Sequence, residues 1–392
     1  MSQLSIDFKE TIPVGPLGII PLASSAALGQ KVNDYIVSWR NDRTGEHRSN
    51  ILFEDYQRDS YLISSKCSRF GSGEAKGTIH ESIRGKDLYF IVDVTNYNIT
   101  YKLCGHENRM SPDDHFADLK RLIAAACGKA RRINVIMPFL YESRQHRRTN
   151  RESMDCAIAL QELRSMGVEN IITFDAHDPR VQNAIPVSGF DSVQPTYQFM
   201  KALFRSVDDL RVDKDHLMII SPDEGAMSRA TYYANVLKVD MGMFYKRRDY
   251  SRIVNGRNPI VAHEFLGSSV KGKDVFIIDD MISSGESMLD VAQELKKRGA
   301  KRVFVAVTFG LFTNGLAEFD RYYEQGIISK VLTTNCIYQT PELLSRPYYV
   351  SVDMSKYTAL IIDSLNHDHS ISGLLDPYDK IHALMKRYGQ HI

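Results

Sequence analysis

The sequence predicts an α/β fold made of two doubly wound domains, and three observations support that prediction. Short apolar runs alternate with amphipathic segments of helical length along the 392 residues. Several runs are nearly continuous Val, Ile and Phe, which is typical of strands buried on both faces of a parallel sheet. A chain of this length also fits about two domains of ordinary size.

The individual elements follow this alternation in chain order. The predicted strands are Leu17–Leu22, Tyr61–Cys67, Asp87–Val94, Ile133–Leu140, Asn170–Phe174, Leu217–Ser221, Met241–Tyr245, Asp274–Ile278, Arg302–Thr308, Lys330–Thr334 and Tyr348–Val352. The predicted helices are Ser24–Val37, Asp113–Cys127, Arg151–Met166, Thr196–Phe204, Gly225–Leu237 and Glu286–Arg298. Asn134–Pro138 and Asp274–Asp280 each lead into a loop and a helix, which hints at a duplicated architecture.

A cluster of turn-forming residues at 186–191 places a domain junction near residue 190. We therefore expect an N-terminal domain over residues 1–190 and a second domain over residues 191–345. Residues 346–392 form a C-terminal segment that we expect to pack back on the N-terminal domain.

Composition excludes several classes of protein. Lys and Arg number 49 and Asp and Glu 48, so a basic surface for nucleic acid is not expected. The five cysteines are odd in number and form no CxxC pair, which argues against a disulfide framework or a thiolate zinc site and favours a reducing cytoplasm. The N-terminus has no signal-peptide pattern, and no apolar stretch is long enough to span a membrane.

The most informative segment is 275–287, where an apolar strand runs into Asp279 and Asp280. Small and hydroxyl-bearing residues follow, namely Ser283, Ser284, Gly285 and Ser287. A loop of this kind at a helix N-terminus can present hydroxyls and backbone N–H groups to a phosphate. The two acids repel phosphate but suit the hydroxyls of a ribose or a metal ion. Packing alone explains them poorly, because an unpaired carboxylate is costly to bury.

This segment resembles the ribose-5-phosphate signature of the phosphoribosyltransferase fold. The rest of the chain, from about Arg69 to Leu365, resembles the ribose-phosphate pyrophosphokinases, also called phosphoribosyl pyrophosphate synthetases. The resemblance implies two phosphoribosyltransferase-like domains, with ATP-binding segments in the first and the sugar-phosphate and pyrophosphate loops in the second. It also implies that Asp279 and Asp280 hold the ribose hydroxyls while the loop to Ser287 holds the 5-phosphate.

Two segments resemble the ATP-binding parts of this family. In the first, Phe70 would stack on adenine, while Ser72 and Glu74 would contact the base. Taken alone, Phe70 could equally be a core residue. In the second, Arg144 would bind phosphate oxygens and Gln145 would reach the nucleotide.

Two further segments resemble the magnesium and pyrophosphate motifs. The resemblance makes His177 and Asp223 the protein ligands of Mg²⁺, although Mg²⁺ prefers oxygen and keeps most of its waters. Asp223 is the more plausible ligand on chemical grounds. Gly225 opens a turn that can offer N–H groups to pyrophosphate, and Arg229 follows one helical turn later.

Lys246 and Arg248 match the Lys-x-Arg segment at the root of the family's catalytic loop. A polar stretch, 251–257, follows them. In isolation, such a pair is more typical of an exposed basic turn. Beside the other matches, the resemblance makes them the catalytic residues.

The implied reaction is transfer of the β,γ-pyrophosphoryl group of ATP to the anomeric hydroxyl of ribose 5-phosphate, with release of AMP. The resemblance also implies a homo-oligomer. Two other functions remain open, a non-catalytic regulatory paralogue and a phosphoribosyltransferase. The ATP-like segments argue against a phosphoribosyltransferase, and the matched motif residues argue against a non-catalytic paralogue.

Four features depart from the family pattern. Glu286 stands where small residues are usual, and an acid beside a phosphate is repulsive unless it points away. His146 stands where Asp is usual. The stretches Arg40–Ser60 and Leu103–Asp113 are longer than a minimal member needs, and the sequence assigns them no role.

Overall fold

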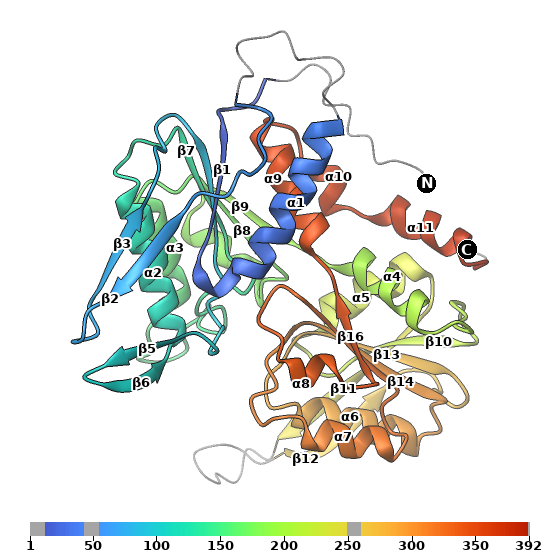
Figure 1. The fold of residues 1–392 in the computed structure, drawn as a ribbon. Helices are drawn as coiled ribbons and strands as arrows, with labels where there is room; N and C mark the ends of the chain where they lie inside the picture. The colour runs from blue at the N-terminus through green and yellow to red at the C-terminus, as the bar shows by residue number, and fades with distance from the viewer. Residues whose placement is uncertain (1–11, 43–54, 249–259, 391–392) are drawn as a thin grey trace. The chain divides into compact units, whose positions relative to one another are not determined.

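The computed structural model describes residues 12–42, 55–248 and 260–390, which form two compact units (Figure 1). Unit 1 contains the chain up to Gln194 together with 335–338 and 353–376. Unit 2 contains 195–334, 339–352 and the residues from Pro377 onward. The C-terminal segment from residue 346 is thus divided between the two units, and only 353–376 belong to unit 1.

The sheet of unit 1 has five parallel strands in the order β1-β4-β7-β8-β9. These strands are β1 (Leu17–Pro21), β4 (Asp87–Ile91), β7 (Arg132–Ile136), β8 (Asn170–Phe174) and β9 (Gly189–Val193). The helices of this unit are α1 (Ala26–Asp42), α2 (Pro112–Ala125), α3 (Asp155–Ser165), α9 (Ser355–Asn366) and α10 (Ser372–Leu375), with the 3-10 helices η1 (Ala23–Ser25) and η4 (Pro179–Ala184).

The sheet of unit 2 has seven strands in the order β12-β11-β10-β13-β14-β15-β16, and only β12 runs antiparallel. These strands are β10 (Leu217–Ser221), β11 (Asp240–Arg248), β12 (Ile260–Leu266), β13 (Asp274–Ile282), β14 (Arg302–Gly310), β15 (Lys330–Thr334) and β16 (Tyr349–Val352). The helices are α4 (Thr196–Ser206), α5 (Met227–Leu237), α6 (Glu286–Lys297), α7 (Ala317–Glu324), α8 (Pro341–Leu344) and α11 (Tyr378–Arg387). The predicted α/β class with two mostly parallel sheets is confirmed.

Two antiparallel hairpins stand apart from the main sheets, both in unit 1 (Figure 1). One joins β2 (Ser65–Arg69) to β3 (Ala75–Ile79), and the other joins β5 (Thr100–Leu103) to β6 (His106–Arg109). The strand predicted at 61–67 was therefore misplaced. Its apolar start makes a single bridge, between Leu62 and Ile19, and the pairing proper begins at Ser65. Four of the five residues of β2 are polar and none is fully buried, which does not suit a sheet buried on both faces.

The turn cluster at 186–191 differs from its prediction in one respect. Its last residues are strand, because Gly189 begins β9 at the edge of the unit 1 sheet. Glycine is needed where that strand starts, since a Cβ on Gly189 would stand 2.0 Å from the side-chain oxygen of Asn170. The boundary between the units follows at Gln194 and Pro195.

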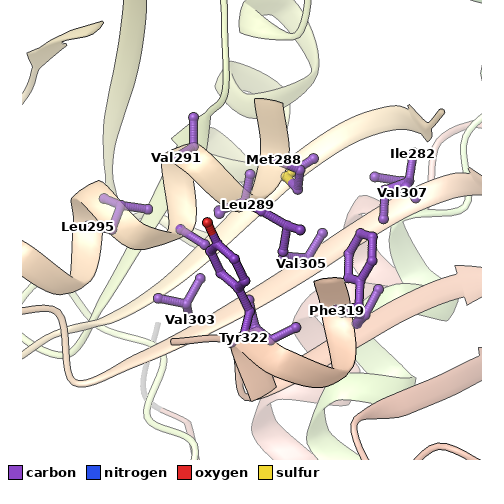
Figure 2. Close-up of a cluster of buried hydrophobic side chains, with 14 of the residues drawn as sticks. Ile282, Met288, Leu289, Val291, Leu295, Val303, Val305, Val307, Phe319 and Tyr322 are labelled. Atoms are coloured by element: carbon purple, nitrogen blue, oxygen red, sulfur yellow. The ribbon is translucent and has the colours of Figure 1, made fainter. Parts of the chain in front are cut away.

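The core of unit 2 fixes the start of α6 against the sheet. Met288, Leu289 and Leu295 of α6 pack with Val303 and Val305 of β14, as Figure 2 shows. Phe319 and Tyr322 of α7 close the same cluster. Because one face of α6 is buried in this way, the short loop between β13 and α6 has little room to move. Among the described residues, no helix combines the length and the apolar character that a membrane crossing requires.

Candidate nucleotide and sugar-phosphate sites

The loop between β13 and α6 is a tight strand-to-helix turn whose shape depends on Gly285. This residue has φ +89°, in the left-handed region, and a Cβ there would stand 2.5 Å from the ring of Phe319. Ser283 and Ser284 are partly buried in the loop, while Ser287 is exposed on the first turn of α6. The carbonyl of Ser283 accepts a hydrogen bond from the backbone of Thr313 at 2.9 Å. The predicted phosphate loop therefore stands at a helix N-terminus, where an anion is favoured.

The acid pair lies at the carboxyl end of β13. Asp280 is 4% exposed and Asp279 is partly exposed, and the backbone N–H of Asp280 donates to Oδ1 of Asp279 at 2.8 Å. Burial, followed by the neighbouring Asp280 carboxylate, raises the pKa of Asp279 well above its usual value. Arg229 opposes this shift and Asp223 adds to it. Four of the predicted site residues of unit 2 therefore interact electrostatically.

The loop between β10 and α5 lies next to this turn, because β10 and β13 are neighbouring parallel strands. Oδ1 of Asp223 accepts hydrogen bonds from the backbone of Gly225 at 2.9 Å and of Ala226 at 3.4 Å. The hydroxyl of Ser221 donates to the carbonyl of Asp223 at 2.6 Å. The Gly225 N–H that we expected to face pyrophosphate is thus bonded to Asp223 in this structure. Asp223 therefore shapes the loop through its own side-chain and backbone hydrogen bonds.

Lys246 and Arg248 lie on β11, which runs past the predicted end at Tyr245 as far as Arg248. The backbones of Lys246 and His263 are partners in the antiparallel pairing with β12, and the register shifts between Arg247 and Arg248. The polar stretch at 251–257 lies outside the described residues. The side chains of the two predicted catalytic residues also lie outside the description, so the structure places their backbone alone.

The β2–β3 turn in unit 1 carries the predicted adenine contacts. Phe70 is 57% exposed, which is unusual for a large aromatic side chain and does not fit a core role. The hydroxyl of Ser72 donates a hydrogen bond to the carboxylate of Glu74 at 2.9 Å, so the two side chains lie side by side. Gly73 between them has φ +92°. The turn presents one aromatic face and two polar groups together, as recognition of a flat base requires.

The segment after β7 carries the other predicted ATP contacts. Arg144 and Gln145 are both exposed, and the backbone of Gln145 donates to the carbonyl of Glu142 at 2.8 Å. Glu142 has φ +54°, which is uncommon for a residue other than glycine. The neighbouring Tyr141 stacks on Phe116 of α2, with ring centroids 4.3 Å apart. The turn is therefore anchored at its root and leaves two side chains available to solvent.

Comparisons with known proteins identify the family of the chain. A family model described as the N-terminal domain of ribose phosphate pyrophosphokinase matches residues 17–167, and one described as the phosphoribosyl transferase domain matches 194–345. The chain is similar to the ribose-phosphate pyrophosphokinase of Mycoplasma genitalium, at 30% identity over 298 residues, covering 74% of this chain and 81% of that protein.

The chain belongs to the ribose-phosphate pyrophosphokinase family. Its relative in Vibrio cholerae serotype O1 is 28% identical over 321 residues, which cover 80% of this chain and 92% of that protein. A solved phosphoribosylpyrophosphate synthetase from Mycobacterium smegmatis superposes with a TM-score of 0.70 at 20% identity, covering 90% of this chain and 99% of the other. That likeness supports the fold, and the two phosphoribosyltransferase-type domains predicted from the sequence are confirmed.

Glu286, the first departure from the family pattern, is exposed at the start of α6. Its carboxylate accepts a hydrogen bond from the side-chain amide of Asn314 at 3.4 Å. Asn314 belongs to the loop after β14, so a partner outside the phosphate loop engages the acid. This contact orients the Glu286 carboxylate toward the loop after β14 and leaves its negative charge in place.

His146, the second departure, lies beside the predicted metal ligand of unit 1. Its ring centroid is 5.3 Å from that of His177, and its Nε2 is 3.4 Å from the carboxylate of Asp178. Hydrogen bonds from Arg180, more than the nearby His146, hold the pKa of Asp178 down at about 2. Sequence reasoning missed this arrangement because the two segments are far apart in the chain.

The predicted magnesium ligands belong to different units, His177 to unit 1 and Asp223 to unit 2. Within the described part of the chain, no group of three or more His, Cys, Asp or Glu side chains could by itself hold a metal ion. The carboxylate of Asp223 is the kind of oxygen donor that Mg²⁺ prefers, and Mg²⁺ takes most of its remaining ligands from water and substrate phosphates.

Proposed function

We propose that this chain makes 5-phosphoribosyl 1-pyrophosphate from ATP and ribose 5-phosphate. The acid pair at the end of β13, followed at once by the Gly285 turn and the α6 N-terminus, carries the proposal. It combines groups for ribose hydroxyls and groups for a phosphate within one short loop.

On the sugar side, Asp279 and Asp280 accept hydrogen bonds from the ribose hydroxyls. The hydroxyls of Ser283, Ser284 and Ser287 donate hydrogen bonds to the 5-phosphate. The backbone at Gly285 brings the loop close to that phosphate. Burial and the neighbouring Asp280 raise the pKa of Asp279 because they disfavour its charged form. Hydroxyl donors from a bound ribose would stabilise that charged form, which fits the proposed role.

On the nucleotide side, Phe70 stacks on adenine while Ser72 and Glu74 contact its edge. Arg144 and Gln145 bind the phosphate and ribose portions. His177 and Asp223 would hold Mg²⁺, which would supply positive charge to neutralise the triphosphate. Arg229 contributes a positive charge on the α5 side of the pyrophosphate loop.

In the transfer step the anomeric hydroxyl oxygen attacks the β-phosphorus of ATP, and the bond from that phosphorus to the α,β-bridging oxygen breaks. AMP leaves with the bridging oxygen, and the hydroxyl proton passes to solvent. Lys246 and Arg248 stabilise the negative charge that spreads over the transferring group. The protein contributes positioning and cations and forms no covalent intermediate with the substrate.

The experiment is an assay of AMP formation from ATP, with ribose 5-phosphate or magnesium left out in turn. We expect AMP to form only when both are present. A Lys246→Ala, Arg248→Ala double variant purified in the same way excludes a contaminating enzyme. Absence of AMP formation from the parent chain, with ATP still bound, would contradict the proposal and favour the regulatory paralogue.

Two departures from the family pattern favour the regulatory alternative, Glu286 exposed on the first turn of α6 and His146 beside His177. A regulatory chain would change the activity of a catalytic relative when mixed with it, without making AMP alone. A phosphoribosyltransferase would instead release pyrophosphate from the sugar pyrophosphate in the presence of a base. The proposed homo-oligomer is tested by measuring the mass of the purified chain in solution.

A further inference from the structure

The turn and second strand of the β5–β6 hairpin lie within Leu103–Asp113, one of the two stretches to which the sequence analysis assigned no role. Its two turn residues, Cys104 and Gly105, have φ values of +49° and +84°. Two consecutive left-handed residues are typical of the tight turn that matches the natural twist of a two-stranded hairpin. The hairpin therefore has a defined tip, with Leu103 and Cys104 at it, although most of its residues are exposed.

That tip contacts the turn that carries Phe70. The backbone N–H of Cys104 donates to the carbonyl of Gly71 at 2.7 Å. A Cβ on Gly73 would stand 2.6 Å from a methyl carbon of Leu103, so the Leu103 side chain fits against the bare backbone of that glycine. Leu103 is 37% exposed, and the covered part of its side chain includes this contact. The two hairpins are joined by one hydrogen bond and one apolar contact at their tips.

A second set of contacts holds the β2–β3 hairpin against α2, with one further contact to β5. Arg69 binds both carboxylate oxygens of Asp118 on α2, at 2.6 and 3.0 Å. Its guanidinium also lies over the ring of Tyr101 of β5, 4.9 Å from the ring centroid. A Cβ on Gly77 of β3 would stand 2.8 Å from the backbone of Arg121 on α2, so the strands of the first hairpin sit directly on that helix.

Two different elements therefore hold the two parts of the β2–β3 hairpin, its strands and its turn. A two-stranded hairpin alone is marginal in water and needs tertiary contacts to hold a shape. Helix α2 supplies them to the strands. The turn from Phe70 to Glu74 lies beyond the strands, and the β5–β6 tip contacts it.

We propose that the β5–β6 hairpin positions the nucleotide-binding turn, with Leu103 as the positioning residue that keeps the turn ready for adenine. This inference rests on the proposed ATP site at Phe70, Ser72 and Glu74. Leu103 touches the turn and not the reacting groups. Loosening the turn lowers the fraction of the chain that is competent to bind ATP, and the apparent affinity falls by that fraction.

The test is Leu103→Ala. We expect its dissociation constant for ATP to rise about three- to tenfold, the effect of leaving one or two side chains to be ordered on binding. Calorimetric titration with ATP and Mg²⁺, without ribose 5-phosphate, measures this constant whether or not the chain turns over. In the assay of AMP formation, the Michaelis constant for ATP should rise by a similar factor. The turnover number and the Michaelis constant for ribose 5-phosphate should stay within about twofold of the parent, because the turn acts before the transfer step.

Three variants serve as controls. Leu103→Met keeps the apolar volume and should restore parental ATP binding. His106→Ala removes the exposed cross-strand partner of Leu103 and should leave ATP binding unchanged. Cys104→Asn keeps the backbone N–H and tolerates the left-handed conformation, so it should also bind ATP like the parent. In a Phe70→Ala background the effect of Leu103→Ala should shrink, because the aromatic contact that it positions is gone.

An unchanged ATP dissociation constant in Leu103→Ala would overturn the inference, and so would a matching rise in the ribose 5-phosphate constant, which would indicate general unfolding. A parent chain that binds ATP but makes no AMP would overturn the proposed activity and leave this binding test decisive. A parent chain that binds no ATP would overturn both.

Discussion

Strand β4 of unit 1 and strand β13 of unit 2 occupy matching positions, each being second in a run of five parallel strands when β11 and β12 are set aside. The two strands also begin in the same way. Each starts with a buried acid, Asp87 or Asp274, that binds the arginine opening the next strand. Arg132 reaches Asp87 at 2.8 and 2.9 Å, and Arg302 reaches Asp274 at 2.9 and 2.6 Å. The duplication that the sequence hinted at is therefore real but offset, because the counterpart of β13 is β4 and not the strand at 134–138.

The two strands also end alike, at the same spacing from their first acid. Asp93 follows β4 and is 2% exposed, while Asp280 stands near the end of β13. After that point they diverge. Asp93 accepts hydrogen bonds from the backbone and hydroxyl of Thr95 and from the backbone of Tyr338, at 2.7–2.8 Å. Asp280 instead stands beside a second acid and a tight phosphate-type loop.

The same arrangement of strands therefore supports two different roles for the buried acid at the strand end, Asp93 in unit 1 and Asp280 in unit 2. In unit 1 the acid holds loop backbone, and the chain then departs into the β5–β6 hairpin before α2 begins. In unit 2 the acid belongs to the candidate sugar site. The loops after the strands, rather than the strands, separate the two roles.

The largest effect should come from the part of unit 2 that lacks a counterpart among the described residues of unit 1, the β11–β12 pair. A Lys246→Ala, Arg248→Ala double variant should lose turnover by on the order of 10³-fold, because cations beside the transferring group act on charge that develops during transfer. Substrate affinities should change little. Steady-state kinetics with both substrates measures this. Arg247→Ala is the matched control and should keep most of the activity; turnover of the double variant within threefold of the parent would contradict the assignment.

The next largest effect is the dependence of folding stability on pH that Asp93 causes. Burial raises its pKa to about 6, against the bonds from Thr95 and Tyr338 that favour the charged form. Between about pH 4 and 6 the folded chain holds a proton that the unfolded chain has lost, so stability falls as the pH rises. The cost at pH 7 is about 3 kcal/mol, and Asp93→Asn should remove this dependence on pH.

Hydrogen exchange of the β4 amides in the full chain, from pH 4.5 to 7, measures the opening free energy of unit 1 without assuming one cooperative transition. The matched variant is Asp280→Asn, which should weaken ribose 5-phosphate binding. Asp93→Asn should leave that binding intact. Equal effects of the two variants on ribose 5-phosphate would break the comparison between the two strand ends.

A smaller effect, a weaker affinity for ribose 5-phosphate, is expected from Gly285→Ala. The left-handed backbone would cost about 1–2 kcal/mol, and the added carbon would also meet Phe319. The Michaelis constant for ribose 5-phosphate should rise about tenfold or more, since 1.4 kcal/mol is a tenfold change. Gly272→Ala has a similar backbone angle, φ +76°, with open space around it, and serves as the control. Unchanged sugar-phosphate kinetics in Gly285→Ala would remove this loop from the site.

The smallest effect is expected at Phe70. Phe70→Ala should raise the Michaelis constant for ATP about fivefold, since aromatic stacking contributes roughly 1 kcal/mol. The ribose 5-phosphate constant and the melting temperature should not move, because the side chain is largely exposed. Kinetics and a thermal melt of the same preparation check both. A fall in melting temperature with a rise in both constants would return Phe70 to a structural role.

The sequence by itself determined the α/β class, nearly all the strands of both sheets and the family. Buried parallel strands are continuous apolar runs, and a strand ending in Asp279, Asp280 and a serine loop has few structural explanations, so both features are readable from local pattern. Tertiary structure alone decided the rest. Exposed hairpins such as β5–β6 have polar strands with no core face, so their pairing leaves a weak local signal. The hydrogen bond from Cys104 to Gly71 and the hydrogen bond from Tyr338 to Asp93 join residues that are far apart in the sequence, and no local pattern specifies such contacts.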